Sequence, residues 1–129
     1  MAEQRLLVLG AMSASQWRSS YAKRYPMLSE DPADDERRQQ LTADLKARGN
    51  AAVKKNSMRE ALVLYARAIE LTPGDPKLRA NSSMVHLKLG DFSTALSDAE
   101  EAIRLDGNWP KGYYRKAQAL GKLGRYNEA

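Results

Sequence analysis

The chain has 129 residues, of which 43% are hydrophobic and 29% are charged, and these proportions are ordinary for one soluble globular domain. No stretch approaches the roughly 18 apolar residues that a membrane-spanning helix needs, and the absence of cysteine excludes disulfides, thiol nucleophiles and cysteine-ligated zinc. Residues 1–40 are neutral overall, so the net charge of +5 comes from the rest of the chain; this excess fits nucleic acid, a membrane surface or an acidic protein segment.

The first 41 residues are an N-terminal extension that matches no family motif. The apolar run at residues 6–12 is too short, and too close to Glu3, to favour a secretion signal. Residues 15–25 predict a short helix that ends before Pro26. Asp31 as the cap and Pro32 as the first helical residue predict a second helix that runs into the following segment. The remainder is expected to be disordered or to serve as a second docking element.

From residue 42 onward the sequence repeats with a period of 34 residues. Ala61 aligns with Ala95 and Ala129, and Ala68 aligns with Ala102. Within a unit, apolar residues recur at helical spacing, as in residues 61–69. Breaks at residues 72–76 and 105–110 separate the units, and shorter breaks near Asn56 and Gly90 separate two helices inside a unit. A period of this length predicts stacked helical hairpins.

One feature of the third unit is unfavourable for an isolated helix. Lys111 and Arg115 are four residues apart after Pro110, so two like charges lie side by side on one face. Such a pair costs roughly 0.2–0.5 kcal/mol. It is explained if an anion binds between the two side chains.

The repeat resembles the tetratricopeptide repeat (TPR), whose pattern the first unit supplies with Leu45, Gly49, Ala61, Tyr65, Ala68 and Pro73. The second unit departs from the pattern at Arg79, Ser83 and His86. The resemblance implies an all-α solenoid of helical hairpins, about two and a half repeats, over residues 42–129. Its units are 42–75, 76–109 and a truncated 110–129, so we expect a piece of something longer in which Leu120 and Leu123 face water.

Within this family, five polar residues are similar to the carboxylate clamp of Hop-like co-chaperones: Lys46, Asn50, Asn81, Lys111 and Arg115. Their separations agree with the family's register throughout. The resemblance implies capture of the acidic C-terminal tail, Glu-Glu-Val-Asp, of heat-shock chaperones of the seventy or ninety kilodalton class. A terminal Asp offers two carboxylates, which lysine, arginine and amide donors can bind together.

Further residues have two possible interpretations. Lys54, Lys88 and Lys122 recur at the same period and either add positive potential to the groove or are surface lysines carried along by the repeat. His86, the one histidine, is expected to be packed or half-buried. Trp109 and the tyrosine pair 113–114 are expected to pack around the turn rather than to stack on nucleic acid.

The sequence therefore predicts a co-chaperone adaptor that is not an enzyme, with no cofactor, no metal site, no nucleic-acid partner and no membrane partner. A cytoplasmic location is expected, with the nucleus as an alternative. Two rival functions remain open. One is a general scaffold for another acidic partner, and the other is the TPR part of a longer enzyme such as a phosphatase, prolyl isomerase or ubiquitin ligase.

Overall fold

A computed structural model describes residues 14–124, which form helices joined by short turns and contain no strand. A 3-10 helix, Pro26–Ser29, follows the first of the α-helices. The α-helices described are α2 (Ala14–Tyr21), α3 (Asp35–Lys54), α4 (Met58–Leu71), α5 (Pro76–Leu89), α6 (Phe92–Leu105) and α7 (Pro110–Leu123). The all-α prediction is confirmed. The apolar run at residues 6–12 and the last residues of the third unit, 125–129, lie outside the described residues.

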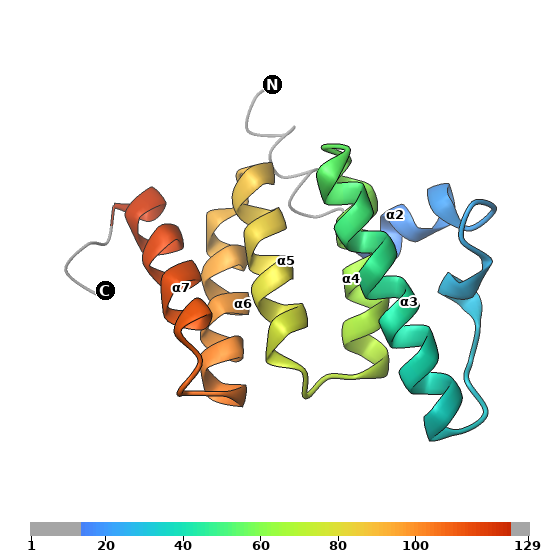
Figure 1. Ribbon diagram of the computed structural model, residues 1–129. Helices are drawn as coiled ribbons and strands as arrows, with labels where there is room; N and C mark the ends of the chain where they lie inside the picture. The colour runs from blue at the N-terminus through green and yellow to red at the C-terminus, as the bar shows by residue number, and fades with distance from the viewer. Residues whose placement is uncertain (1–13, 125–129) are drawn as a thin grey trace.

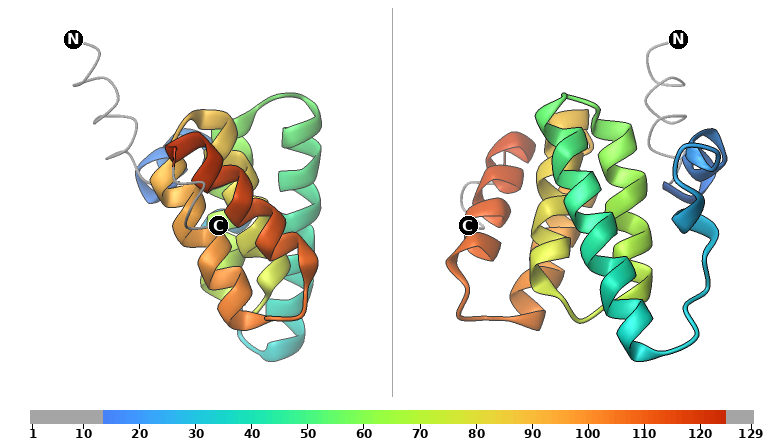
Figure 2. Two further views of the ribbon diagram at one scale, coloured as in Figure 1. Left: turned by 90° about the vertical axis from the view of Figure 1, so that its left-hand side faces the viewer. Right: turned by 45° about the vertical axis from the view of Figure 1, so that its right-hand side comes forward.

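The helices from α3 onward pack as antiparallel hairpins in two layers. Helices α3, α5 and α7 form one layer, and α4 and α6 form the other behind it (Figures 1 and 2). Helices α3, α5 and α7 run in the same direction, so their C-terminal ends lie at one end of the molecule (Figure 1). Any side chain that repeats along the three helices therefore recurs across one surface.

Local sequence signals set the helix ends. Pro76 and Pro110 occupy first-turn positions of α5 and α7, where the missing N–H is not needed. The Asp75 side chain caps α5 by accepting a hydrogen bond from the Lys77 N–H at 2.9 Å. Gly90 ends α5 with a φ of 84°, a left-handed conformation that glycine adopts without strain. These breaks lie where the sequence predicted them.

The start of α3 differs from the prediction. Asp31 was expected to cap this helix, but the cap is Asp34, whose carboxylate accepts from the Arg37 N–H at 2.8 Å. The Arg37 side chain also pairs with Glu30, which ties the helix start to the segment before it. Pro32 consequently lies in the linker rather than in the first turn. The predicted continuity is confirmed, because α3 runs unbroken into the first repeat.

The N-terminal segment packs against α4 rather than lying free. Trp17, Tyr25 and Leu28 are buried in the same apolar cluster as α3 and α4. The Tyr25 hydroxyl donates to the buried Glu60 carboxylate, and Arg18 pairs with Glu70 at 2.7 Å. Figure 2 shows α2 on the outer side of α4, away from α3. This segment therefore covers a helix face that the repeats alone would leave exposed.

A second, smaller apolar cluster joins α6 and α7, and it corrects one expectation. Leu120 was expected to face water but is only 2% exposed, because it packs with Ala95, Leu96 and Ala119. Leu123 is partly buried against the same cluster. The apolar stripe of α7 thus faces the second repeat. No helix among residues 14–124 is long and apolar enough to cross a membrane.

The contact between α3 and α4 requires a residue without a side chain at position 49. A Cβ atom on Gly49 would lie 2.5 Å from Cε1 and 2.8 Å from Cδ1 of the Tyr65 ring. Such distances are shorter than van der Waals contact, so the ring or the helix would have to move. Tyr65 is itself fully packed, at 1% exposure. Gly49 thus lets the two helices approach closely.

We predict that Gly49→Ala lowers the free energy of unfolding by about 1–3 kcal/mol, because overpacking outweighs the better helix propensity of alanine. Urea unfolding followed by circular dichroism measures the change. The matched control is Gly74→Ala, where a Cβ atom meets nothing within 4 Å, and it should change stability by less than about 0.5 kcal/mol. Equal stability of the two variants would contradict the close-packing argument.

Candidate peptide-binding groove

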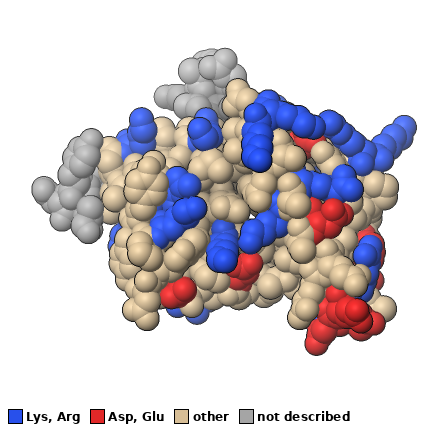
Figure 3. Space-filling model, viewed as in Figure 1, with Lys and Arg blue, Asp and Glu red and all other residues tan. Residues whose placement is uncertain are grey.

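All seven residues predicted to bind a peptide lie on the layer formed by α3, α5 and α7. Helix α3 carries Lys46, Asn50 and Lys54, α5 carries Asn81 and Lys88, and α7 carries Lys111 and Arg115. Figure 3, viewed as in Figure 1, shows Lys and Arg side chains in a band across this layer, while Asp and Glu gather mainly near the start of α3. The layer thus presents a basic surface.

Helix α3 turns its predicted residues toward α5. Gly49 contacts the Tyr65 ring and so marks the side of α3 that faces α4. At about 100° per residue, Lys46 and Asn50 lie roughly 60° and 100° around the helix from Gly49, in the same rotational sense. Both residues therefore lie on one flank of α3.

Helix α7 presents its two cations in the opposite sense. A Cβ atom on Gly112 would lie 3.1 Å from Cγ1 of Ile103, so Gly112 marks the side that faces α6. Lys111 and Arg115 lie roughly 100° and 60° from it in the other rotational sense. Helices α3 and α7 flank α5 and run the same way (Figure 1), so these opposite offsets turn both sets toward α5.

Helix α5 supplies the amide between them. The Ser83 hydroxyl donates to the carbonyl oxygen of Ala95 in α6 at 2.7 Å, which fixes the inner side of α5. Asn81 lies two residues earlier, about 160° around the helix, and so faces away from α6. We call the surface between α3 and α7 that contains Lys46, Asn50, Asn81, Lys111 and Arg115 the clamp face.

The buried Tyr65 fixes the orientation of Asn50. Its hydroxyl donates a hydrogen bond to the Asn50 side-chain oxygen. Burial raises the pKa of Tyr65 to about 12, so the hydroxyl keeps its proton at neutral pH. With its oxygen engaged, Asn50 directs its amide nitrogen, a double donor, away from Tyr65. That is the group a carboxylate needs.

Arg115 is held in place by its own helix. One terminal nitrogen donates to the Gln118 side-chain oxygen at 2.9 Å, and the Gln118 nitrogen donates to the Tyr114 hydroxyl at 3.2 Å. The guanidinium carbon lies 5.3 Å from the centre of the Tyr114 ring. Burial lowers the pKa of Arg115 below its ordinary value, but arginine stays charged in proteins. A preorganised cation loses less entropy when it binds an anion.

The tyrosine pair of α7 has two different roles, which corrects the expectation that both pack around the turn. Tyr113 does so, because its hydroxyl donates to the Gly107 carbonyl at 2.9 Å. Tyr114 is 57% exposed and lies beside Arg115 instead. An exposed aromatic ring, which the repeat pattern did not reveal, therefore lies next to Arg115 of the clamp face.

The cations of this face lack carboxylate partners. Within residues 14–124, no Asp or Glu oxygen lies within 4.0 Å of a charged nitrogen of Lys46, Lys54, Lys88, Lys111 or Arg115. By contrast, the neighbouring Lys116 lies 3.9 Å from Glu100. Unpaired cations gathered on one surface attract an anion from solution. Among the described residues, no His, Asp and Glu gather in a group that could hold a metal ion.

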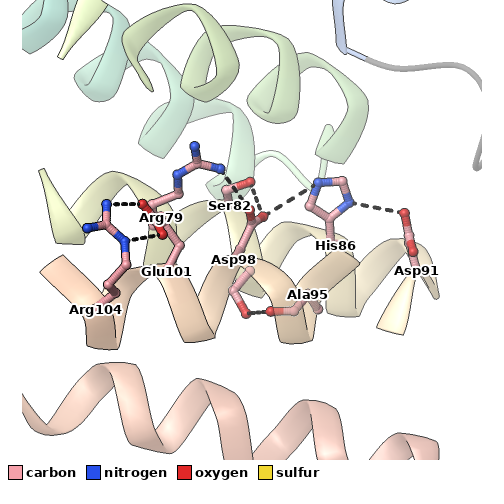
Figure 4. Close-up of polar contacts among 9 residues, drawn as sticks. Arg79, Ser82, His86, Asp91, Ala95, Asp98, Glu101 and Arg104 are labelled. Atoms are coloured by element: carbon pink, nitrogen blue, oxygen red, sulfur yellow. Dashed lines mark hydrogen bonds and ion pairs between the residues drawn. The ribbon is translucent and has the colours of Figure 1, made fainter. Parts of the chain in front are cut away.

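A buried polar cluster joins α5 to α6 where the second unit departs from the TPR pattern (Figure 4). The carboxylate of Asp98, with a side chain 8% exposed, accepts from the Ser82 hydroxyl at 2.6 Å and from Arg79 at 3.2 Å. His86 is half-buried, as predicted. Its Nε2 lies 3.8 Å from the Asp98 carboxylate, and its Nδ1 lies 3.6 Å from the Asp91 carboxylate. The cluster thus fixes how α5 sits on α6, and with it Asn81.

Sequence reasoning did not find Asp98. The available signal was the spacing of Arg79, Ser82 and His86, which places three polar side chains on one helix face. Burial raises the pKa of the Asp98 carboxyl, and the Ser82 hydrogen bond and the charges of His86 and Arg79 oppose that rise. The cluster supports the groove from behind rather than contributing to its surface.

Comparison with known proteins gives this architecture its family. The tetratricopeptide repeat model matches residues 76–108 and 110–129. The solved second TPR of Spaghetti (RPAP3), bound to HSP90 peptide SRMEEVD, is 32% identical, with a TM-score of 0.68, over 73% of this chain and 89% of that one. The chain belongs to the tetratricopeptide repeat family.

Two further TPR proteins show how widely the similarity extends. The second TPR domain of human RPAP3, solved in complex with HSP70 peptide SGPTIEEVD, is 32% identical with a TM-score of 0.68, over 70% of this chain and 76% of that one. The E3 ubiquitin-protein ligase TTC3 of Rattus norvegicus is 42% identical over 85 residues, 66% of this chain. This TPR chain spans only 4% of the length of that ligase.

We predict that the buried carboxyl of Asp98 makes stability depend on pH. Because its pKa is raised in the folded state, the folded protein binds the proton more tightly than the unfolded chain does. The resulting stabilisation is complete below the ordinary pKa of about 3.8 and is lost as pH rises through the raised value. The free energy of unfolding of the native protein should therefore fall, relative to that of Asp98→Asn, as pH rises above about 3.8.

Urea unfolding at a series of pH values measures this difference. Asp31→Asn is the control, because it removes an exposed carboxylate and should leave the pH dependence of the native protein unchanged. A native stability that rises with pH relative to Asp98→Asn would show that the ion pairs of Asp98 outweigh its burial.

Proposed function

We propose that this TPR domain is a co-chaperone module that binds the acidic C-terminal tail of heat-shock chaperones of the seventy or ninety kilodalton class. The observation that carries the proposal is the clamp face, on which cations and amides from three helices turn toward one groove without carboxylate partners. The two RPAP3 structures support it, because those similar domains hold peptides that end in Glu-Glu-Val-Asp.

The residues divide the terminal carboxylates of the peptide between them. Lys46 acts as a point charge on one carboxylate, and the amide nitrogen of Asn50, oriented by Tyr65, donates to the same group. Asn81 donates to the peptide and accepts from its backbone, which keeps the chain extended. Lys111 and Arg115 bind the remaining negative charge, and the arginine can do so with two parallel hydrogen bonds.

The expected affinity is moderate. Charge-assisted hydrogen bonds contribute at best about 1.5–3 kcal/mol each, but the groove is solvated and the flexible tail must be ordered. A net of roughly −7 to −8 kcal/mol corresponds to a low-micromolar Kd. Binding should weaken as salt is added, because charges at the surface are screened over about 8–10 Å at physiological ionic strength.

This function implies a cellular location for the chain and a division of the chain into a binding domain and an extension. Cytosolic chaperones place the domain in the cytoplasm, with the nucleus as an alternative. The TPR units 42–75, 76–109 and 110–129 form the binding domain, and residues 1–41 form its extension. The similarity to TTC3 favours one further candidate, a TPR segment within a longer ubiquitin ligase, in which the same groove would serve to recruit a chaperone or another acidic partner.

We predict that Lys111→Ala and Arg115→Ala each weaken binding of the peptide SRMEEVD by about 1–3 kcal/mol, roughly 5-fold to 150-fold in Kd, because each removes a cation from the clamp face. Fluorescence anisotropy with a labelled peptide measures the affinity. The matched control is Lys116→Ala, which removes an equal charge from α7 but lies beside Glu100. This variant should change the affinity less than 2-fold, because the charge of Lys116 is already offset by Glu100 and exposed ion pairs contribute little.

The terminal carboxylate provides a second arm of the same experiment. The peptide as its C-terminal amide should bind at least about 10-fold more weakly than the free acid. If free acid and amide bind alike, the groove is a general acidic-partner scaffold. If both alanine variants bind like the native protein, the clamp assignment is wrong.

We also predict an effect of Tyr65→Phe, which removes the hydroxyl that orients Asn50 while it keeps the buried ring. The variant should bind the free-acid peptide about 2-fold to 10-fold more weakly, the worth of one hydrogen bond, although Tyr65 itself is buried. The control is Tyr21→Phe, which lies on α2 and outside the layer formed by α3, α5 and α7. It should bind the free-acid peptide with the native affinity. A normal affinity for Tyr65→Phe would show that Asn50 needs no fixed orientation.

A further inference from the structure

Tyr113 and Tyr114 of α7 are the exposed large hydrophobic side chains of residues 14–124. Tyr113 is 50% exposed and Tyr114 is 57% exposed, so accessibility alone does not separate them. Their hydroxyls have different partners. The Tyr113 hydroxyl donates to the Gly107 carbonyl at 2.9 Å, in the turn before α7, whereas the Tyr114 hydroxyl accepts from the Gln118 amide at 3.2 Å. A group added to one hydroxyl therefore meets different neighbours from a group added to the other.

The two tyrosines also lie on opposite flanks of α7. Measured from Gly112, which marks the side that faces α6, Tyr113 lies about 100° around the helix in one rotational sense. Lys111 lies about 100° and Tyr114 about 160° in the opposite sense, which is also the sense of Arg115. Tyr114 therefore shares the flank of the clamp cations, and Tyr113 does not.

A single glutamine amide spans the gap between the Tyr114 hydroxyl and the Arg115 guanidinium. The nitrogen of Gln118 donates to Tyr114, and its oxygen accepts from Arg115 at 2.9 Å. A phosphate on the hydroxyl would extend it by two bonds, oxygen to phosphorus to oxygen, as many as separate the nitrogen and the oxygen of the amide. Phosphate oxygens at this place can therefore replace Gln118 as the acceptor for Arg115.

Charge at the Tyr114 oxygen is already coupled to Arg115. The guanidinium carbon lies 5.3 Å from the centre of the Tyr114 ring. Burial lowers the pKa of Arg115, and negative charge on the Tyr114 side chain opposes that lowering. Lys46, Lys111 and Arg115 of the clamp face have no carboxylate partner within residues 14–124. An anion attached to Tyr114 would thus meet no competing carboxylate on these cations.

We propose that Tyr114 is a phosphorylation site, and that its phosphate binds Arg115 and Lys111 and so closes the clamp face to a peptide carboxylate. The inference rests on the proposed function, since it concerns the regulation of that same site. A tyrosine kinase joins the phenolic oxygen to the γ-phosphorus of ATP. The bond from that phosphorus to the bridging oxygen breaks, ADP leaves with its electron pair, and the phenolic proton passes to the base of the kinase.

The charge of the phosphate makes the closure effective. Phosphotyrosine carries about −1.5 to −2 charges at pH 7, enough to cancel most of the positive charge of Lys111 and Arg115. Because it lies on the same helix as both cations, the phosphate acts as an intramolecular ligand and competes with a peptide that must be captured from solution. Lys46 then remains as the one uncompensated clamp cation among the described residues.

The place of Tyr114 in the fold favours access by a kinase. Helix α7 is the outermost of the described helices in its layer (Figure 1). Its N-cap residue, Trp109, makes no side-chain cap hydrogen bond, so the first turns can open locally while the other repeats stay folded.

The first test identifies the modified hydroxyl. The full chain, incubated with MgATP and a broad-specificity tyrosine kinase, should gain a phosphate at residue 114, located by mass spectrometry. Tyr114→Phe should lose this phosphate, and Tyr113→Phe, the matched control, should keep it. If neither the native chain nor Tyr113→Phe gains a phosphate at residue 114, the inference is overturned.

The second test measures binding of the peptide SRMEEVD to the full chain with phosphotyrosine placed during translation at residue 114 or, as the control, at residue 113. The form modified at 114 should bind at least about 10-fold more weakly than the unmodified chain, and the form modified at 113 should change less than about 2-fold. Treatment with a tyrosine phosphatase should restore the affinity of the form modified at 114.

A third measurement reads the phosphate directly and needs no peptide. Phosphorus NMR against pH gives the second pKa of each phosphotyrosine, ordinarily about 6. Binding by Arg115 and Lys111 should lower this pKa in the form modified at 114 but not in the form modified at 113. Lys111→Ala in the form modified at 114 should return the pKa toward its ordinary value.

The outcomes separate this inference from the proposed function. If the unmodified chain binds the peptide and the form modified at 114 binds it equally well, the clamp stands and the inference is overturned. Equal phosphate pKa values at 113 and 114 also overturn it, because the cations then do not hold the phosphate. If the unmodified chain does not bind the peptide, the proposed function fails, and the closure proposed here fails with it.

Discussion

The groove depends on how α3, α5 and α7 are rotated about their own axes, and close packing against the second layer sets that rotation. Gly49 touches the Tyr65 ring, Gly112 touches Ile103, and the Ser83 hydroxyl binds the Ala95 backbone. Each contact needs a small residue on α3, α5 or α7, because a larger side chain would push that helix outward or turn it about its axis. A rotation of one residue, about 100°, would move a clamp side chain off the shared surface.

Tyr65 links this packing directly to the binding chemistry. Its ring occupies the space that Gly49 leaves, and its hydroxyl donates the hydrogen bond that orients Asn50. In the first repeat, Tyr65 therefore belongs both to the hydrophobic core and to the support of the binding site. In the second repeat the link is polar: the carboxylate of Asp98 gathers Arg79, Ser82 and His86 beneath Asn81. The two repeats reach the same helix orientation by different contacts.

The sequence was sufficient for the parts that local chemistry decides. The breaks at residues 72–76 and 105–110 and the break near Gly90 predicted both ends of α5 and the start of α7, and the 34-residue period predicted the hairpins. It was insufficient where the outcome depends on neighbours. Asp31 and Asp34 are equally good caps in isolation, and the contacts of Arg37 with Asp34 and Glu30 decide between them. Likewise Leu120 is buried by α6 residues that lie far from it in the sequence.

The candidate site was predictable as a set of positions but not as a surface. Register placed Lys46, Asn81 and Arg115 on equivalent helices, whereas the orientation of Asn50 by Tyr65 and of Arg115 by Gln118 depends on side-chain contacts. Asp98 was missed because a lone Asp in an amphipathic helix ordinarily faces water. Its burial follows from three polar partners on the neighbouring helix, a pairing that no single-helix pattern contains.

The docked N-terminal segment has a practical meaning for where this protein can be cut. A fragment begun at Thr42, where the repeat pattern starts, would lose Trp17, Tyr25 and Leu28 together with the capped first turns of α3. The fragment would also remove the Tyr25 hydroxyl that donates to the buried Glu60, and it would expose an apolar stripe along α4. A fragment that begins at Thr42 would therefore expose apolar surface that favours aggregation, whereas one that retains α2 would keep that surface covered.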